Sequence, residues 1–191
     1  MRKILVCAAL AAASLSAAEP VTRILIAYHS QTGNTARMAK AISDGAASVA
    51  GAEVVLKKVT DVTPEDVKRA NGIVLGSPVH MHSLSVESMQ FIGRLANILG
   101  QDGGEGRTAG VFCTGGGVSL GKEMARLEAI AAFLEMHFVI IGGVEADGWG
   151  NLGPEATTGD PAHPNLSEKD LATARRAGAR FARLTRQFQA K

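Results

Sequence analysis

The sequence predicts an α/β fold, a three-layer, doubly wound domain with a parallel sheet of five strands. Short apolar runs alternate with helical patterns along the chain, and this alternation is typical of right-handed βαβ units and a parallel sheet. Most of the apolar runs are nearly continuous, as expected for strands that helices cover on both faces. A length of 191 residues without an internal repeat suits one domain of this kind.

Each expected strand and helix follows from a local pattern. The run at residues 53–58 is more polar than the others and indicates an edge strand. Pro64 follows Thr63 as the first residue of one helix, and Ser167 with Asp170 forms a capping-box variant at the start of another. The expected strands are residues 24–28, 53–58, 72–77, 108–113 and 138–143, and the expected helices are residues 35–50, 63–70, 85–100, 120–137 and 167–189.

The first 18 residues have the pattern of a secretory signal peptide. Arg2 and Lys3 form a positive start, an apolar run covers residues 4–16, and Ser16-Ala17-Ala18 matches the small-x-small cleavage pattern. The apolar run is too short to span a bilayer as a helix. We therefore expect cleavage near Ala18, export to the periplasm, and a single mature domain over residues 19–191 without a membrane segment.

Composition excludes several classes of partner. Loss of Arg2 and Lys3 lowers the number of basic residues from 20 to 18, which equals the number of acidic residues. A neutral mature chain has no basic excess for nucleic acid and no strong acidity for docking a basic redox partner. The mature chain also keeps a single cysteine, Cys113, so it cannot form an internal disulfide.

The most informative segment is the loop after the first expected strand. Residues 30–35 are small or hydroxylated and stand directly before a helical pattern. Such a loop is a typical anion site, because the unpaired N–H groups and the positive dipole end of the helix face it. The spacings of the nucleotide P-loop and of the dinucleotide fingerprint are both absent. With no Lys or Arg in the loop, a phosphate would be bound by neutral donors.

Two more loops follow strands of the same sheet. Residues 76–83 read Gly-Ser-Pro-Val-His-Met-His-Ser, where Pro78 is expected to stiffen the turn and the backbone of residues 79–81 can contact a flat ring. Residues 113–119 read Cys-Thr-Gly-Gly-Gly-Val-Ser, and consecutive glycines allow close backbone approach to a ligand. Ligands of doubly wound sheets bind beyond the carboxyl ends of the strands. The three loops therefore predict one shared site.

Two other chemistries are disfavoured. Cys113 precedes a glycine-rich loop as in phosphatases, but Ser119 stands where such a loop needs an arginine. His80 and His82 could place two imidazoles on one side of an extended segment, yet no third ligand has a recognisable spacing, so no metal site is expected. His29 is interpreted as a loop or surface histidine.

The loop at residues 28–35, Tyr-His-Ser-Gln-Thr-Gly-Asn-Thr, resembles the flavodoxin pattern Tyr-x-Ser-x-Thr-Gly-Asn-Thr, which binds the monophosphate of FMN. With the Gly-Ser-Pro and Thr-Gly-Gly-Gly loops, residues 153–158 and the helix at 166–175, the chain is similar to the tryptophan-repressor-binding-protein-like NAD(P)H:quinone oxidoreductases. These are flavodoxin-like FMN proteins. The resemblance covers nearly all of residues 22–189 and implies the strand order 2-1-3-4-5.

The resemblance also implies an activity, in which NAD(P)H reduces FMN by two electrons and a quinone or another redox partner is then reduced. His80 is the candidate donor of a proton to the reduced flavin or to a quinone oxygen. Homo-oligomers, dimers or tetramers, are implied, with residues 145–165 near a neighbouring subunit's flavin. The implied cofactor-binding residues are Ser30, Gln31, Thr32, Gly33, Asn34, Thr35, Pro78, Val79, His80, Met81, Thr114, Gly115, Gly116 and Gly117.

The chain departs from these relatives around the flavin ring. His80 and Met81 stand where the relatives usually carry Arg and Phe, and Thr32 replaces an aromatic residue. Glu135 and Met136 occupy the neighbourhood of a histidine that usually approaches the flavin. The periplasm also has no usual NAD(P)H pool. Two alternatives therefore stay open: an exported electron carrier of the flavodoxin type, and a flavin-binding protein without turnover.

Overall fold

The computed structural model describes residues 21–100, 102–117, 120–143, 152–158 and 165–190. The expected signal peptide at residues 1–18 lies outside the described residues, as does most of the segment 145–165. No helix among the described residues is both long enough and apolar enough to cross a membrane.

Five strand positions form one parallel sheet, as the sequence predicts. The strands β1 (Thr22–Tyr28), β2 (Ala52–Lys58), β3 (Gly72–His80), β5 (Thr108–Gly115) and β6 (Val139–Ile140) lie in the order β2-β1-β3-β5-β6. In chain order these are strands 2-1-3-4-5, so the expected order is confirmed. The polar β2 lies at one edge, where the sequence placed an edge strand.

The last strand position is where the sequence prediction is wrong. Instead of one strand over residues 138–143, β6 pairs with only Thr108 and Ala109, and β7 (Glu155–Thr157) pairs with the last residues of β5. Gly143, with φ 74°, turns the chain after Ile141 has made its bond to Ala109. The fifth position is therefore shared by two short strands from distant parts of the chain.

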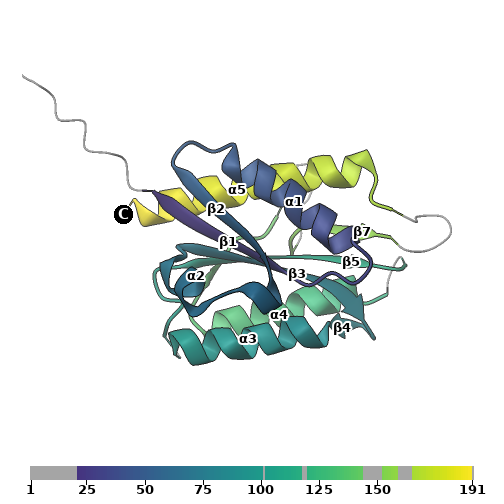
Figure 1. Ribbon diagram of the computed structural model, residues 1–191, viewed down its shortest axis with the longest axis horizontal. Coiled ribbons are helices and arrows are strands. Elements are labelled where there is room, and N and C mark those ends of the chain that lie inside the picture. Colours follow the sequence, from purple (N-terminus) through teal and green to yellow (C-terminus); the bar gives the residue numbers. More distant parts are fainter. Residues whose placement is uncertain (1–20, 101, 118–119, 144–151, 159–164, 191) are drawn as a thin grey trace, which may run out of the picture.

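Helices cover both faces of the sheet (Figure 1). On one face lie α1 (Asn34–Ala47) and α5 (Glu168–Gln189), and on the other lie α2 (Pro64–Arg69), α3 (Val86–Leu99) and α4 (Lys122–Glu135). A short 3-10 helix, η1 (Val59–Asp61), precedes α2. The predicted helix starts are confirmed, with Pro64 in the first turn of α2 and a capping box between Ser167 and Asp170 at α5.

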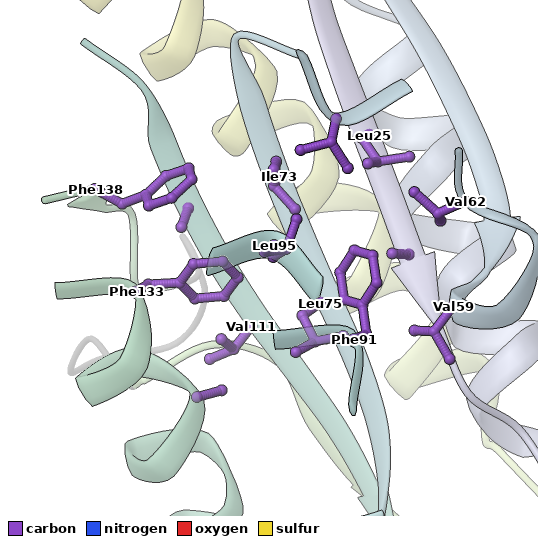
Figure 2. Close-up of a cluster of buried hydrophobic side chains, with 14 of the residues drawn as sticks. Leu25, Val59, Val62, Ile73, Leu75, Phe91, Leu95, Val111, Phe133 and Phe138 are labelled. Atoms are coloured by element: carbon purple, nitrogen blue, oxygen red, sulfur yellow. The ribbon is translucent and has the colours of Figure 1, made fainter. Parts of the chain in front are cut away.

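Each face of the sheet has its own hydrophobic core. On the side of α3 and α4, Phe91 and Leu95 reach down onto Leu75 and Ile73, while Phe133 and Phe138 meet edge to face with ring centroids 5.2 Å apart (Figure 2). The other core joins α1 and α5 to the sheet through Ile24, Ile26, Met38, Ile42, Phe112 and Phe181. Burial of these side chains from water is the main force that fixes both helical layers on the sheet.

Candidate functional site

The candidate site lies at the edge of the sheet where β1, β3 and β5 reach their carboxyl ends. Tyr28 of β1 is in register with Gly76 of β3, and Pro78 of β3 is in register with Thr114 of β5. The loops that follow these three strands therefore leave the sheet beside one another. All three loops identified in the sequence lie at this edge.

The first loop leads into α1 through a glycine with a left-handed backbone. Gly33 has φ 94°, and its N–H donates to Ser30 Oγ at 3.2 Å. The N-cap residue Gly33 makes no side-chain capping bond, and no acidic residue lies in the first turn of α1. A Cβ at Gly33 would have no atom within 4 Å, so the loop opens onto space at this point. In the same loop Gln31 and Thr32 are exposed, whereas Asn34 and Thr35 are buried.

A buried hydrogen bond joins the first loop to the third. The hydroxyl oxygens of Thr35 and Thr114 lie 2.8 Å apart, although the residues are 79 positions apart in the chain. Thr35 is in the first turn of α1 and Thr114 is near the end of β5. This bond therefore ties the start of α1 to the glycine-rich loop that follows β5.

The second loop is a tight hairpin rather than a turn at Pro78. Pro78 lies within β3, and the chain reverses two residues later into β4 (Ser83–Leu84). Both residues of the turn, Met81 and His82, have positive φ, 48° and 67°. This is the backbone of a type I′ turn, which usually requires Asn or Gly. The expectation that Pro78 stiffens the turn is therefore wrong, because Pro78 is a strand residue.

Hydrogen bonds connect the hairpin to α3 and α4. Ser85 N–H donates to Ser77 Oγ at 3.0 Å, and the Ser85 hydroxyl continues the chain of bonds to Ser88 in α3. Glu128 in α4 accepts from the Ser83 hydroxyl at 2.6 Å and from the Leu84 N–H at 3.1 Å. Hydrogen bonds to α3 and α4 therefore fix the base of the hairpin whose turn has positive φ.

The third loop packs tightly against both neighbours. A Cβ on Gly115 would lie 3.1 Å from Lys122 Cγ and 3.5 Å from Val79 Cβ. A Cβ on Gly121, at the start of α4, would lie 2.4 Å from His82 Cα. Only glycines allow the loop, the hairpin and the helix start to approach this closely. Gly116 and Gly117 come after the end of β5, where the chain bends.

Cys113 sits at the base of the third loop as a structural thiol. It is 1% exposed, and burial raises its pKa to about 12. The thiol donates to the Lys122 carbonyl at 3.4 Å. Since the thiolate is the nucleophilic form, a phosphatase role for this cysteine is disfavoured by its burial as well as by Ser119.

Two buried cations behind the third loop were missed from the sequence. Lys122 is 2% exposed and Arg126 is 4% exposed. Arg126 pairs with Glu155 and also donates to the Gly153 carbonyl at 2.6 Å. A signal was present in the sequence, because both cations share the helical face of Ala125, Ala129 and Phe133, which is the buried face of α4.

His29 and His80 meet at the mouth of the site. Their rings are perpendicular, with centroids 6.1 Å apart. The Nδ1 atom of His29 lies 3.4 Å from a Glu87 carboxylate oxygen, and the His29 side chain is 19% exposed. His29 is thus a loop histidine, as one of the two interpretations from the sequence had it, and its backbone N–H donates to the Gly76 carbonyl of β3 at 3.0 Å. Among the described residues, no group of three or more potential metal ligands comes together.

The chain is similar in sequence to several known proteins. A family described as a flavodoxin domain matches residues 25–122. A flavodoxin from Aquifex aeolicus is 35% identical over 122 residues, which are 63% of this chain and 64% of that protein. The match thus spans slightly less than two thirds of that relative. An NAD(P)H dehydrogenase (quinone) from Archaeoglobus fulgidus is 28% identical over 196 residues, 88% of this chain and 100% of that protein.

Solved structures share the fold at lower identity. A flavodoxin described as WrbA-like, from Agrobacterium tumefaciens, has a TM-score of 0.70 at 22% identity, covering 87% of this chain and 99% of that one. A flavodoxin from the domain Archaea has a TM-score of 0.68 at 20% identity, covering 86% of this chain and 99% of that one.

Proposed function

The chain belongs to the flavodoxin domain family, and on that premise we propose that it is an FMN-binding oxidoreductase that transfers electrons from NAD(P)H to a quinone. The observation that carries the proposal is the hydrogen bond between Thr35 and Thr114, because it unites a phosphate-type helix start and a glycine loop in one site. The full-length match to an NAD(P)H dehydrogenase (quinone) supports the nicotinamide and quinone part.

The residues present fit the phosphate of FMN. The N-cap of α1 makes no side-chain capping bond, its first turn holds no acidic residue, and Gly33 leaves space in front of it. An anion there meets N–H groups and the positive end of the helix dipole. On this proposal Ser30 to Thr35 bind the phosphate.

The second and third loops fit a flat ring. The backbone of Val79, His80 and Met81 would border one part of it, and the backbone of residues 114–117 would border the pyrimidine part. When bound, FMN supplies the two-electron chemistry between a hydride donor and a quinone. On this proposal the glycine loop offers its backbone to one edge of the ring, and the hairpin offers the backbone of residues 79–81 to another.

On this proposal His80, packed against His29, supplies the proton that the reduced acceptor takes up. His80 is half-buried at the mouth of the site and can hold a proton on its imidazole. His29 contacts His80, and its Nδ1 lies 3.4 Å from a Glu87 carboxylate oxygen without forming a hydrogen bond to it. We assign His80 as the residue that donates to a reduced acceptor oxygen, with the His29 ring packed against it.

A titration with FMN tests the cofactor. The purified protein should quench FMN fluorescence with a saturable signal, and absence of a signal at micromolar FMN would refute the proposal. Rapid mixing of the FMN-loaded protein with NADH or NADPH should then bleach the flavin. Bleaching by dithionite alone would instead favour the electron carrier, which the similarity to the Aquifex flavodoxin supports. Tight FMN binding without turnover from any donor would favour the non-catalytic protein.

We also propose that the chain forms a homo-oligomer. The exposed face of α4 carries a row of apolar side chains, Met124, Leu127 and Leu134, which are 60%, 45% and 55% exposed. Rows of this kind often mark contacts between proteins. Light scattering should report a dimer or tetramer that Leu127→Glu dissociates, whereas a wild-type monomer would contradict the proposal.

Export to the periplasm is a further part of the proposal, and the pattern of residues 1–18 supports it. N-terminal sequencing of protein from the periplasmic fraction should begin near Glu19. Intact Met1 in cytoplasmic protein would overturn this localisation.

A further inference from the structure

A lysine ammonium group lies buried behind the glycine loop of the candidate site. Lys122 is 2% exposed, although lysine is almost never fully buried unless it is paired. Its Nζ donates to the Gly117 carbonyl oxygen at 2.5 Å and to Thr157 Oγ1 at 3.2 Å. Both acceptors are neutral. Of the carboxylates in the described part of the chain, none is within the 4.0 Å of an ion pair to Lys122.

Among the described residues, the charges near Lys122 do not balance its ammonium group. Arg126, one turn further along α4, is neutralised by Glu155. Lys122 therefore adds one positive charge to the interior that the nearby acidic residue does not balance. An ammonium group without a counter-charge is costly to bury, by several kcal/mol. A ligand that brings negative charge to this place would offset that cost.

The position of Lys122 indicates which part of a ligand it would meet. The stem of the lysine packs on Gly115, and Gly115 in turn lies against Val79 of the hairpin. The ammonium group binds the carbonyl of Gly117, which belongs to the loop proposed for the pyrimidine part of the flavin. Lys122 thus lies behind the meeting point of the two ring loops. The first loop is joined to this region by the hydrogen bond between Thr35 and Thr114.

Reduction changes the charge of a flavin at this same part. A hydride from a nicotinamide brings two electrons and one proton, the nicotinamide leaves as its oxidised cation, and the flavin ring gains one negative charge. That charge resides mainly on the pyrimidine part. A protein cation close to it stabilises the reduced cofactor relative to the oxidised one.

We propose that Lys122 is the counter-charge for the reduced flavin, so that it raises the two-electron reduction potential of bound FMN and favours acceptance of a hydride. This inference rests on the proposed FMN site and deepens it. Lys122 acts through the field of its charge and through the Gly117 carbonyl that it holds. It is a tuning and positioning residue, and it takes no part in bond making.

The test compares the affinities of oxidised and reduced FMN in Lys122→Met, which removes the ammonium group and keeps an unbranched stem of the same length. We expect Lys122→Met to weaken binding of reduced FMN at least tenfold more than binding of oxidised FMN. A tenfold difference corresponds to a fall of about 30 mV in the potential of a two-electron couple. Lys122→Arg, which keeps the charge, should retain most of the wild-type potential.

Two controls separate the inference from simpler explanations. Lys68→Met makes the same change on an exposed face of α2 and should leave the potential unchanged. Riboflavin, which lacks the phosphate, should still bind to wild-type protein more tightly when reduced than when oxidised. If Lys122 serves the phosphate instead, riboflavin shows no such preference and Lys122→Met weakens both redox states of FMN equally. Either result overturns the inference.

The riboflavin measurement uses wild-type protein, so the absence of a preference for reduced riboflavin overturns the inference even if Lys122→Met does not fold. Failure of the wild-type protein to bind FMN at all would refute the proposed function. Normal FMN binding with an unchanged potential in folded Lys122→Met would refute the role of Lys122 alone.

Discussion

At the scale of single residues, two glycines both have room for a methyl group but differ in backbone conformation. A Cβ would meet no atom within 4 Å at either Gly33 or Gly93. Gly33 has φ 94° at the start of α1, whereas Gly93 lies within α3 without a positive φ. The difference between them is therefore a property of the backbone and not of packing.

Alanine at these two positions should act in opposite directions. Gly33→Ala forces a left-handed alanine and should lower the free energy of unfolding by about 1 to 2 kcal/mol. Gly93→Ala should raise it by about 0.5 to 1 kcal/mol, because alanine is the better helix former. Urea denaturation of both variants measures the difference, and equal effects would contradict this reading of Gly33.

Asp66 gives a second prediction at this scale. The hydrogen bond from Lys57 Nζ, 2.7 Å long, lowers the pKa of Asp66 to about 2. Because the folded-state pKa lies below the unfolded value of about 4, the ionised pair stabilises the protein above pH 4. That contribution, about 1 to 2 kcal/mol, is lost as the pH falls from about 4 to 2.

Asp66→Asn should therefore flatten the dependence of unfolding free energy on pH in this window. Glu65→Gln on the same helix is the control. The Glu65 side chain is 72% exposed, and its carboxylate makes only a long, weak pair with Arg69, with Oε1 4.0 Å from Arg69 Nε. The control should keep the wild-type slope. An unchanged slope in Asp66→Asn would show that the pair with Lys57 does not form in solution.

At the scale of elements, the hairpin of β3 and β4 combines a strained tip with a rigid base. Its turn residues Met81 and His82 both have positive φ, and Met81 is 94% exposed. Non-glycine residues in this conformation cost about 1 to 3 kcal/mol each. Strain of this kind concentrates where a loop must present its backbone to a ligand, which agrees with the role proposed for residues 79–81.

Met81→Asn should raise stability by about 0.5 to 1 kcal/mol, because asparagine tolerates the left-handed region and the exposed methionine makes little contact. Met89→Asn makes the same change in α3, where asparagine is a poorer helix former than methionine, and should be destabilising by about 0.5 kcal/mol. Thermal unfolding of the two variants shows whether each substitution raises or lowers stability. Destabilisation by Met81→Asn would mean that the turn relaxes in solution.

At the scale of the whole molecule, the helical layer on one face depends on direct contact between two helices. A Cβ on Gly178 of α5 would lie 1.9 Å from the Ile42 carbonyl oxygen of α1, and a Cβ on Gly45 would lie 1.9 Å from the Arg175 carbonyl oxygen. The backbones of α1 and α5 are therefore in contact at one glycine of each helix. The layer can close only if neither position carries a side chain.

Gly178→Ala should push α5 away from α1 and lower the free energy of unfolding by about 2 to 3 kcal/mol. Gly93→Ala, the same substitution on an open helix face, is the matched control and should be stabilising. Guanidinium denaturation compares them. A near-neutral Gly178→Ala would show that the helices can separate without loss of the core.

Much of this architecture could be predicted from the sequence, because β1, β3 and β5 are continuous apolar runs and the helices between them have clear starts. The strand order came from the resemblance of residues 28–35 to a flavodoxin loop. β7 could not be predicted, since three residues inside a Gly- and Pro-rich stretch form a strand only because the end of β5 offers them a partner.

The candidate site divides in the same way. Its three loops follow apolar strands, so their common edge could be inferred from residue order alone. The contacts within it could not. Lys122 lies on the apolar face of its helix, which indicates burial, but the contacts of its side chain follow from how α4 packs on Gly115. His29 meets His80 only because β1 and β3 are neighbours in the sheet.

Cys113 has a consequence for the compartment in which the mature chain is expected to work. Thiol–disulfide exchange needs an accessible thiolate, and this thiol is 1% exposed with its pKa raised to about 12. Disulfide-forming catalysts of an oxidising compartment would therefore find no sulfur to attack in the folded domain. We therefore expect the folded domain to keep this cysteine as a free thiol in such a compartment, without mixed disulfides or covalent dimers.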